Sequence, residues 1–194
     1  MQRLSSFLSV LILASLLAGC APRANAQSKE VKAVDSSYAP TDLPENSETV
    51  SKDPPADCPI TVPQDPPFAA PAPYSPSSPS DWDFRYGSNS LWTAVPKDGV
   101  WFGLPHNPEG YTQKVFWWRE GYVWTEEPEP ALTVTGERLD AHAPPLIVSK
   151  ATNAYSSDIG SAMLVGVDFP TLGCWKITGR YKDAKLSFVV WVAP

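Results

Sequence analysis

The sequence has few of the residues that build most catalytic and metal sites. Its only histidines are His106 and His142, and it has no Gly-x-Ser-x-Gly segment, so a serine triad or a zinc hydrolase has few parts available. With only two methionines, Met1 and Met163, a methionine-rich copper site is excluded. No stretch of convincing length has the periodicity of a helix. We therefore expect an all-β chain with no catalytic residues, no metal site and no cofactor.

Positive charge is also scarce. The chain has 15 Lys and Arg against 21 Asp and Glu, a net charge of -6. Because Arg3 is the only charged residue before Cys20, removal of that leader would leave 14 basic and 21 acidic residues, a net of -7. This balance argues against a nucleic acid or an anionic lipid surface as a partner.

The first twenty residues have the pattern of an export signal. Arg3 gives a positive start, Leu4–Leu17 is apolar, and Leu17-Ala18-Gly19-Cys20 ends the stretch with small residues before a cysteine. This ending resembles the lipobox of bacterial lipoproteins, in which the cysteine thiol takes a diacylglyceryl group and becomes the new N-terminus after cleavage. The resemblance implies lipidation of Cys20 and a cell-envelope location. Because Ala21 rather than Asp follows the cysteine, the outer membrane is expected if the host has one.

Two alternatives to the lipid anchor remain open. The first is a membrane-spanning helix, which needs about 20 residues, whereas Leu4–Leu17 has 14 residues and is interrupted by serines. The segment Ala24-Asn25-Ala26 is a site where ordinary signal peptidase could cut before Gln27 and release a soluble protein. Lipid on Cys20 would instead hold the chain on a membrane, because acyl chains contribute about 0.8 kcal/mol per buried methylene.

Proline and tryptophan divide the rest of the chain into two unlike parts. Of 22 prolines, 12 fall between Pro40 and Pro79, whereas all eight tryptophans lie at or after Trp82. A polar, Pro-rich chain cannot bury enough apolar surface to offset its conformational entropy. The composition predicts four segments: a signal peptide at 1–19, a disordered tether at 20–57, a Pro-rich extended segment partly packed on the domain at 58–80, and a β-sandwich domain at 81–194.

The tether is interpreted as a spacer. A Pro-rich chain extends by about 3.1 Å per residue, so residues 21–57 could hold a domain up to roughly 100 Å from the lipid. The alternative is that the proline clusters dock onto a partner's aromatic groove.

Two cysteines remain once Cys20 is lipidated or cleaved away. Cys58 and Cys174 are then an even pair, and leftover thiols in an exported chain usually form a disulfide. A bridge would close a loop of over a hundred residues, for which the chain-entropy model gives about 4 to 5 kcal/mol. It would also place the start of the domain near residue 57. Two separate buried thiols are the alternative.

From Asp81 onward the chain consists of short β-branched and aromatic segments bounded by Gly, Pro, Asp or Asn, which is typical of strands and turns. Strands are predicted near Ser90–Val95, Val100–Leu104, Lys114–Trp118, Leu132–Glu137, Leu146–Ser149, Ala162–Phe169, Cys174–Tyr181 and Leu186–Val192. Lys97-Asp98-Gly99 predicts a hairpin between the first two, and Arg180–Ala184 predicts one between the last two. This spacing indicates an antiparallel sandwich or barrel.

The segment from Phe169 to Tyr181, with the strand that follows it, resembles the final hairpin of immunoglobulin-like domains, which implies an Ig-like β-sandwich. Cys58 departs from the antibody pattern, because it precedes every predicted strand. The same segment, with Leu91-Trp92-Thr93, Phe116-Trp117-Trp118-Arg119 and the stretch from Leu132 to Leu139, is similar to a group of uncharacterised exported bacterial proteins that end in a Gly-Cys-Trp hairpin. That resemblance covers roughly residues 88 to 194 and implies a fold but no activity.

The most unusual chemistry lies between Phe116 and Trp124. Adjacent residues of a strand face opposite sides, so Trp117 and Trp118 cannot both point into the core. The indole that faces away from the core, beside Arg119, could stack on a sugar ring or on a partner's apolar surface, and Trp124 could do the same. In the alternative, a loop or the Pro-rich segment covers the tryptophans, and they fill the core of a small domain.

The remaining polar clusters give weaker signals. His106 and His142 could meet near carboxylates around a metal, although nothing in their spacing demands it. The segment Glu126-Glu127-Pro128-Glu129-Pro130 could bind a cation or act as an acid/base pair, but without ligand spacing a solvated acidic loop is the favoured interpretation. Three hypotheses result. The first is a lipid-anchored, non-enzymatic binding or structural module whose partners are the membrane and an envelope protein or glycan. The second is carbohydrate or cell-wall recognition through exposed tryptophans, and the third is an envelope enzyme or metal carrier that uses the histidines.

Overall fold

The computed structural model describes residues 50–74 and 81–194, which belong to one compact unit. These residues form strands, turns and extended segments with no helix among them. Accordingly, no helix in the described ranges has the length and apolarity that a membrane span requires. The predicted signal peptide, Cys20 and the tether up to residue 49 lie outside the described residues.

In the described part of the chain, eleven strands form two sheets, and the prediction of an all-β sandwich is confirmed. The larger sheet has the order β1-β2-β5-β9-β7, with β4 also paired to β5 and β8 to β9. Its strands are β1 (Asp83–Ser88), β2 (Leu91–Pro96), β4 (His106–Asn107), β5 (Gly110–Trp118), β7 (Ile147–Val148), β8 (Thr152–Ser156) and β9 (Gly160–Phe169). The smaller sheet has the order β3-β11-β10-β6 and contains β3 (Val100–Trp101), β6 (Thr133–Arg138), β10 (Gly173–Tyr181) and β11 (Ala184–Val192).

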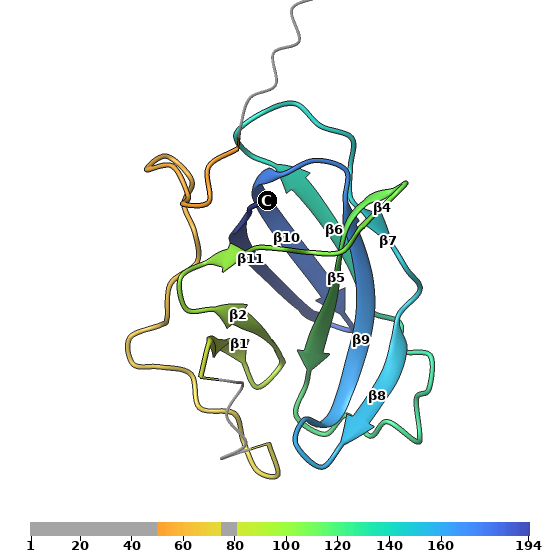
Figure 1. The fold of residues 1–194 in the computed structure, drawn as a ribbon. Helices are drawn as coiled ribbons and strands as arrows, with labels where there is room; N and C mark the ends of the chain where they lie inside the picture. The colour runs from red at the N-terminus through yellow and green to blue at the C-terminus, as the bar shows by residue number, and fades with distance from the viewer. Residues whose placement is uncertain (1–49, 75–80) are drawn as a thin grey trace, which may run out of the picture. The chain divides into compact units, whose positions relative to one another are not determined.

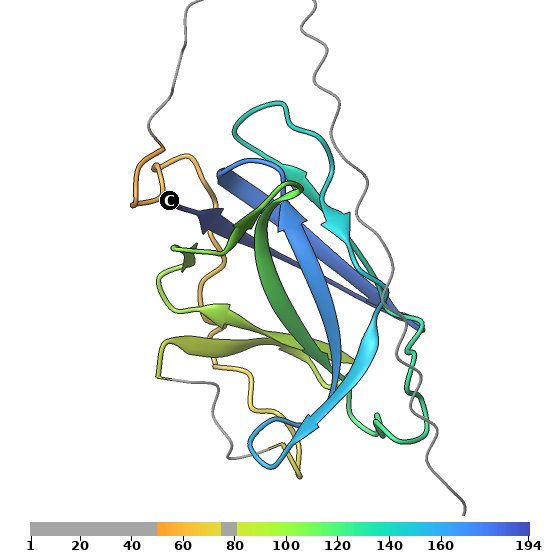
Figure 2. The same cartoon turned by 45° about the vertical axis from the view of Figure 1, so that its right-hand side comes forward.

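The core lies between the two sheets, where alternate residues of the long strands point inward. Figures 1 and 2 show β5 and β9 side by side, with β10 and β11 in the other layer. Val165 and Val167 of β9 face Ile177 of β10, and all three side chains are almost completely buried. Alternate residues of β11, among them Phe188 and Val190, also belong to this core. The resemblance to immunoglobulin-like domains stays a prediction.

One of the two predicted hairpins is wrong. Lys97-Asp98-Gly99 does not join paired strands, because β2 pairs with β1 and β5, whereas β3 pairs with β11 in the other sheet. This turn therefore carries the chain from one sheet to the other, and the β3–β11 pair is parallel. The hairpin between β10 and β11 is confirmed, with Tyr181 opposite Ala184. The predicted strand at Val100–Leu104 is also shorter than expected, since β3 ends at Trp101.

Three strands were not predicted. β1, β4 and β8 are short or half-exposed segments in which polar residues and glycine interrupt the apolar pattern. They are held by pairing with long neighbours, as when β8 runs antiparallel to β9 from Thr152 opposite Leu164 to Ser156 opposite Gly160. Such strands depend on their partner rather than on their own composition.

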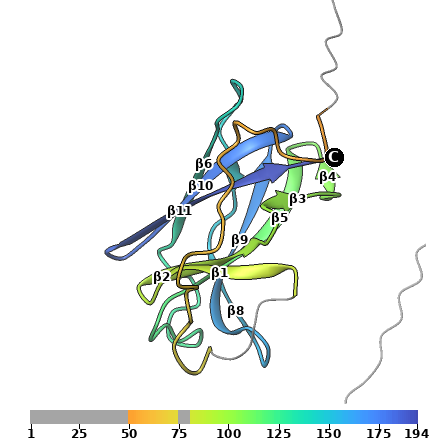
Figure 3. The same cartoon turned by 90° about the vertical axis from the view of Figure 1, so that its left-hand side faces the viewer.

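Residues 50–74 form an extended segment without regular secondary structure, which we call the strap. Figure 3 shows it, in orange to yellow, crossing β11 and then β2 along one side of the sandwich. Its first part packs Cys58 and Ile60 against Trp191 and Cys174. Its last part packs Phe68, Ala70 and Tyr74 against Trp92 and Trp118. Residues 50–57, which the sequence assigns to the tether, already contact the domain, because Trp191 Nε1 donates a hydrogen bond of 2.9 Å to the Ser51 carbonyl.

Candidate functional site

The four aromatic and basic residues singled out from the sequence lie in four different surroundings. Trp117 is in the core with no exposed surface, where its ring lies 5.8 Å from that of Phe188. Gly179 of β10 makes room for it, because a Cβ there would approach the indole to 2.5 Å. Trp117 Nε1 has no hydrogen-bond partner among the described residues. Trp117 therefore serves packing and is not a surface for ligands.

Trp118, Arg119 and Trp124 point to separate parts of the surface. Trp118 is half-buried under the strap and donates a hydrogen bond of 2.9 Å from Nε1 to the Ile159 carbonyl. Arg119 pairs with Asp183 at 2.7 Å and lies over the Tyr181 ring. Trp124 stacks on Tyr155 of β8, with ring centroids 5.2 Å apart. The structure does not bring these residues into one site. The strap packs on Trp118, in line with the alternative that the Pro-rich segment covers a tryptophan of this run.

A different set of aromatic residues lines an open groove of about 780 Å³ beside β2 and β5. We call it the aromatic groove and define it by Trp82, Trp101, Phe102, Leu104 and Phe116. Its volume falls within the range of about 300 to 1,000 Å³ that is usual for small-molecule sites.

The groove exists because β2 and β5 diverge after two paired positions. Trp92 lies opposite Trp118 and Thr93 opposite Trp117, but no pairing continues toward Ala94. The rest of β2 stays paired with β1, up to Pro96 opposite Asp83, and Pro96 has no N–H with which it could bond to β5. The turn at residues 97–99 then takes the chain to the other sheet, so Ala94 and Pro96 line one side of the gap and residues 113–116 of β5 line the other.

The far wall is β3 and the residues that follow it. The ring of Trp101 is anchored in the core, 5.8 Å from Phe169 and 6.0 Å from Phe188. Its carbonyl accepts a hydrogen bond of 2.8 Å from the Ala193 N–H, which fixes the backbone. Because neighbouring residues of an extended chain point to opposite sides, Phe102 projects outward and is 71% exposed.

Trp82 stands at the entrance of the groove and is 81% exposed. Its backbone is nevertheless held, because the Trp82 carbonyl accepts a hydrogen bond of 2.8 Å from the Lys97 N–H. Lys97 Nζ also donates to the Asp81 carbonyl at 2.6 Å. A large aromatic side chain on a fixed backbone and with little cover is a typical anchor for a partner or ligand.

The rim of the groove carries charges of both signs. Five charged residues line it: Asp81, Asp83, Asp98, Lys97 and Lys114. One carboxylate oxygen of Asp98 already accepts the Val100 N–H at 3.0 Å and so shapes the turn. The groove therefore combines an apolar floor with a few polar groups, the arrangement that most ligand sites share.

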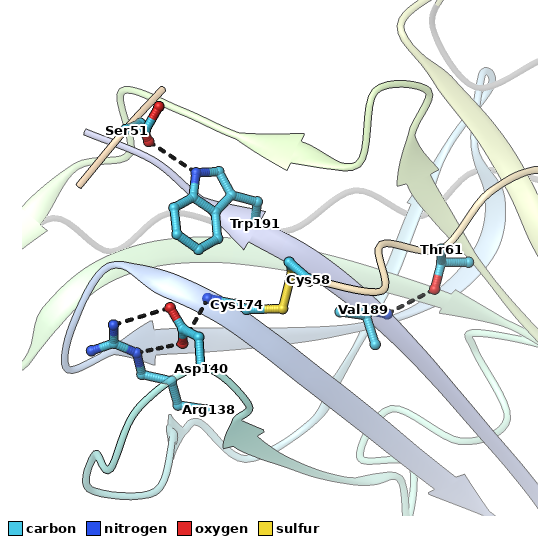
Figure 4. The surroundings of a disulfide bond; sticks show 8 residues. All are labelled: Ser51, Cys58, Thr61, Arg138, Asp140, Cys174, Val189 and Trp191. Atoms are coloured by element: carbon cyan, nitrogen blue, oxygen red, sulfur yellow. Dashed lines mark hydrogen bonds and ion pairs between the residues drawn. A yellow bond between two sulfur atoms is a disulfide. The ribbon is translucent and has the colours of Figure 1, made fainter. Parts of the chain in front are cut away.

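The predicted disulfide is present and joins the first part of the strap to β10. Cys58 and Cys174 are bonded, with their Cα atoms 5.7 Å apart (Figure 4). Asp140 accepts the Cys174 N–H at 3.1 Å and pairs with Arg138. Partial burial acts to raise the pKa of Asp140, but the hydrogen bonds from Arg138 and Cys174 outweigh it and hold the pKa below its ordinary value. This ion pair fixes the backbone beside the disulfide, as Figure 4 shows.

A cluster of tyrosines lies between the strap and the hairpin of β10 and β11. Tyr74 of the strap donates from its hydroxyl to the Tyr122 carbonyl at 3.2 Å. Tyr122 and Tyr181 both direct their hydroxyls to Glu127, the former to its carbonyl and the latter to its carboxylate. Burial, followed by the charge of Glu127, raises the pKa of Tyr122 to about 12. Glu127, which the sequence placed in an acidic loop, is thus occupied by internal contacts.

The histidines do not meet. The ring of His106 lies 4.6 Å from that of Tyr111, and His142 is exposed in the segment after β6. Within residues 50–74 and 81–194, no three His, Cys, Asp or Glu side chains are grouped so that they could hold a metal ion. Comparison of the chain with protein-family models, with curated proteins and with solved structures found no match.

The sequence did not single out the aromatic groove. Trp82 and Phe102 are isolated aromatics next to turns, and nothing local distinguishes them from buried ones. The available signal was the Pro96-Lys97-Asp98-Gly99 segment, which ends one strand and redirects the chain. Its effect depends on which sheet the next strand joins, and that choice is made by long-range pairing.

Proposed function

We propose that the chain is a cell-envelope lipoprotein, held on a membrane by lipid on Cys20, whose β-sandwich is a non-enzymatic binding module. The resemblance of residues 17–20 to a lipobox supports the anchor. The disulfide between Cys58 and Cys174 supports export, because such bonds persist in oxidising compartments. The aromatic groove is the observation that carries the binding role.

The strap supports this arrangement mechanically. Cys58 bonds the strap to β10, a central strand of the smaller sheet, and Thr61 hydrogen-bonds to Val189 of β11 in both directions. A tether that begins at Cys20 would therefore end at a covalently fixed point of the domain. Val100, which lines the groove, packs against the cluster around this disulfide, so the attachment lies next to the β3 side of the groove, while Trp82 and Phe102 stay exposed to a partner.

Membrane attachment is tested by expressing the full-length chain and Cys20→Ala in a bacterium that processes lipoproteins. The unaltered chain is expected in the membrane fraction, and mass spectrometry of its N-terminal peptide should show a diacylglyceryl-modified Cys20. The Cys20→Ala variant should be absent from the membrane fraction, because it cannot be lipidated. An unmodified N-terminus at Gln27 would overturn the anchor and leave a secreted protein.

The binding role is tested by placing the photo-crosslinking residue benzoylphenylalanine in the membrane-anchored chain. Phe102→benzoylphenylalanine lies at the groove, and Tyr155→benzoylphenylalanine is the matched control at an aromatic residue that is 58% exposed elsewhere. Adducts of defined mass are expected at position 102 and not at 155. Equal labelling, or no adduct at position 102, would count against the groove as the binding face.

A further inference from the structure

The side chains of the aromatic groove suit a ligand that has flat, weakly polar faces and many hydroxyl groups. Trp82 and Phe102 expose most of their ring surface, and Trp101 and Phe116 lie deeper and are half-buried. The C–H face of a pyranose ring stacks on such aromatic rings and is attracted by their negative π face. An aliphatic lipid chain would contact the apolar floor but has no hydrogen-bonding groups to offer the charged residues of the rim.

The charges of the rim discriminate between classes of ligand. Three aspartates and two lysines border the groove, so a polyanion would meet more carboxylates than ammonium groups. Nucleic acids and phosphate-rich polymers are disfavoured for this reason, in agreement with the net charge of -6. Sugar hydroxyls both donate and accept hydrogen bonds, so carboxylates such as Asp81 and cations such as Lys114 can all bind them.

The floor adds a further preference. Ala94, Val100, Leu104 and Val115 give small and branched apolar side chains beside the aromatic rings. The methyl group of an acetamido substituent fits such a surface, and its N–H and C=O can reach the polar rim. We infer that the aromatic groove binds a short glycan of N-acetylated hexosamines. This inference rests on the proposed binding function and names the ligand class for its groove.

The experiment measures calorimetric binding by the detergent-solubilised full-length protein. The probes are the β-1,4-linked tetramer of N-acetylglucosamine, the glucose tetramer with the same linkage, and a proline-rich decapeptide. Trp82→Ala and Phe102→Ala test the groove, and Tyr155→Ala is the control at an exposed aromatic outside it. Unchanged melting temperatures show that the variants fold, because the side chains removed are exposed.

The N-acetylated tetramer is expected to bind, and its Kd should rise at least about tenfold in Trp82→Ala and in Phe102→Ala. Tyr155→Ala should leave the Kd unchanged, and the glucose tetramer should bind more weakly than its acetylated analogue. The inference would be overturned if the Kd of the acetylated tetramer were the same in both groove variants as in the unaltered protein. Tighter binding of the glucose tetramer would also overturn it. If only the peptide binds, and Trp82→Ala and Phe102→Ala weaken its binding, the inference of a glycan ligand would be overturned but the proposed binding function would stand. If no probe binds and position 102 gives no crosslink, both proposals fail.

Discussion

The outer face of the larger sheet has a covered half and an open half, and both halves are aromatic. In the covered half, Trp92 is 1% exposed because Phe68 and Tyr74 of the strap pack on it at centroid distances of 5.6 and 5.2 Å. The open half is bordered by the aromatic groove, whose Trp82, just before β1, and Phe102, just after β3, are more than two-thirds exposed. The boundary runs between Phe116 and Trp118, whose rings stack 6.0 Å apart. Burial on this face is therefore decided by where the strap runs and not by the type of residue.

We expect the covered half to contribute to the stability of the fold and the open half to contribute to binding. Apolar surface that the strap removes from water contributes about 25 cal/mol per Å² to folding, and surface left exposed in the groove is available for the same gain on binding. The strap can hold its position because Cys58 is bonded at one end and Tyr74 is hydrogen-bonded at the other. Changes in the covered half should therefore lower the free energy of unfolding, whereas changes in the open half should affect only binding.

Removal of the disulfide should have the largest effect on stability. Cys58 and Cys174 are 116 residues apart, and the double variant Cys58→Ser, Cys174→Ser should lose about 4 to 5 kcal/mol of unfolding free energy because the unfolded chain gains loop entropy. Denaturation in urea measures this loss. Reductant should destabilise the unaltered protein similarly and leave the double variant unaffected. A loss below about 1 kcal/mol would mean that the hydrogen bonds and packing of the strap hold it without the bond.

Truncation of tryptophan should distinguish the two halves directly. Trp92→Ala should cost about 3 to 5 kcal/mol, because it leaves a cavity between the sheet and the strap. Trp82→Ala, at the same residue type in the open half, should change the unfolding free energy by less than about 0.5 kcal/mol. Thermal and urea denaturation of both variants measure the difference. Equal losses would show that Trp82 also packs against the domain.

Part of the fold could be predicted from the sequence, but the different surroundings of Trp92 and Trp82 could not. The all-β class, β9 to β11 and the disulfide follow from local alternation and from an even number of cysteines, and all are confirmed. The cover over Trp118 was one of two open alternatives. The groove that Trp82 borders was not predicted, because its far wall depends on β3 joining β11 rather than β2, a contact between residues about ninety positions apart.

Alkaline pH should lower the free energy of unfolding through the buried tyrosines that lie beside the end of the strap. The pKa of Tyr122 is raised to about 12, and burial with the nearby Glu127 also raises that of Tyr181 above its ordinary range. A phenol with a higher pKa in the folded chain contributes stability that is complete below pH 10, the ordinary value, and is lost as the pH rises through the folded pKa. Each such phenol can lower the unfolding free energy by up to about 1.4 kcal/mol per pH unit in that window.

Urea denaturation from about pH 9 to about pH 11 measures this loss. In Tyr122→Phe the stability at neutral pH should fall slightly, since the hydrogen bond to the Glu127 carbonyl is removed. Its decline with rising pH should, however, be shallower than that of the unaltered protein. Parallel pH profiles for the two proteins would show that this phenol does not titrate differently in the folded chain.

The smallest effect should come from a single hydrogen bond of the strap. Thr61 Oγ1 accepts the Val189 N–H at 2.8 Å, and Thr61→Val would leave that N–H without its partner while keeping the side-chain volume. The expected loss is about 1 kcal/mol of unfolding free energy. The reverse change at the next residue, Val62→Thr, is the control, because Val62 is 62% exposed and should tolerate it within about 0.5 kcal/mol. If both changes cost the same, the strap is held at this point by the neighbouring disulfide, and its hydrogen bonds to β11 only follow the path that Cys58 imposes.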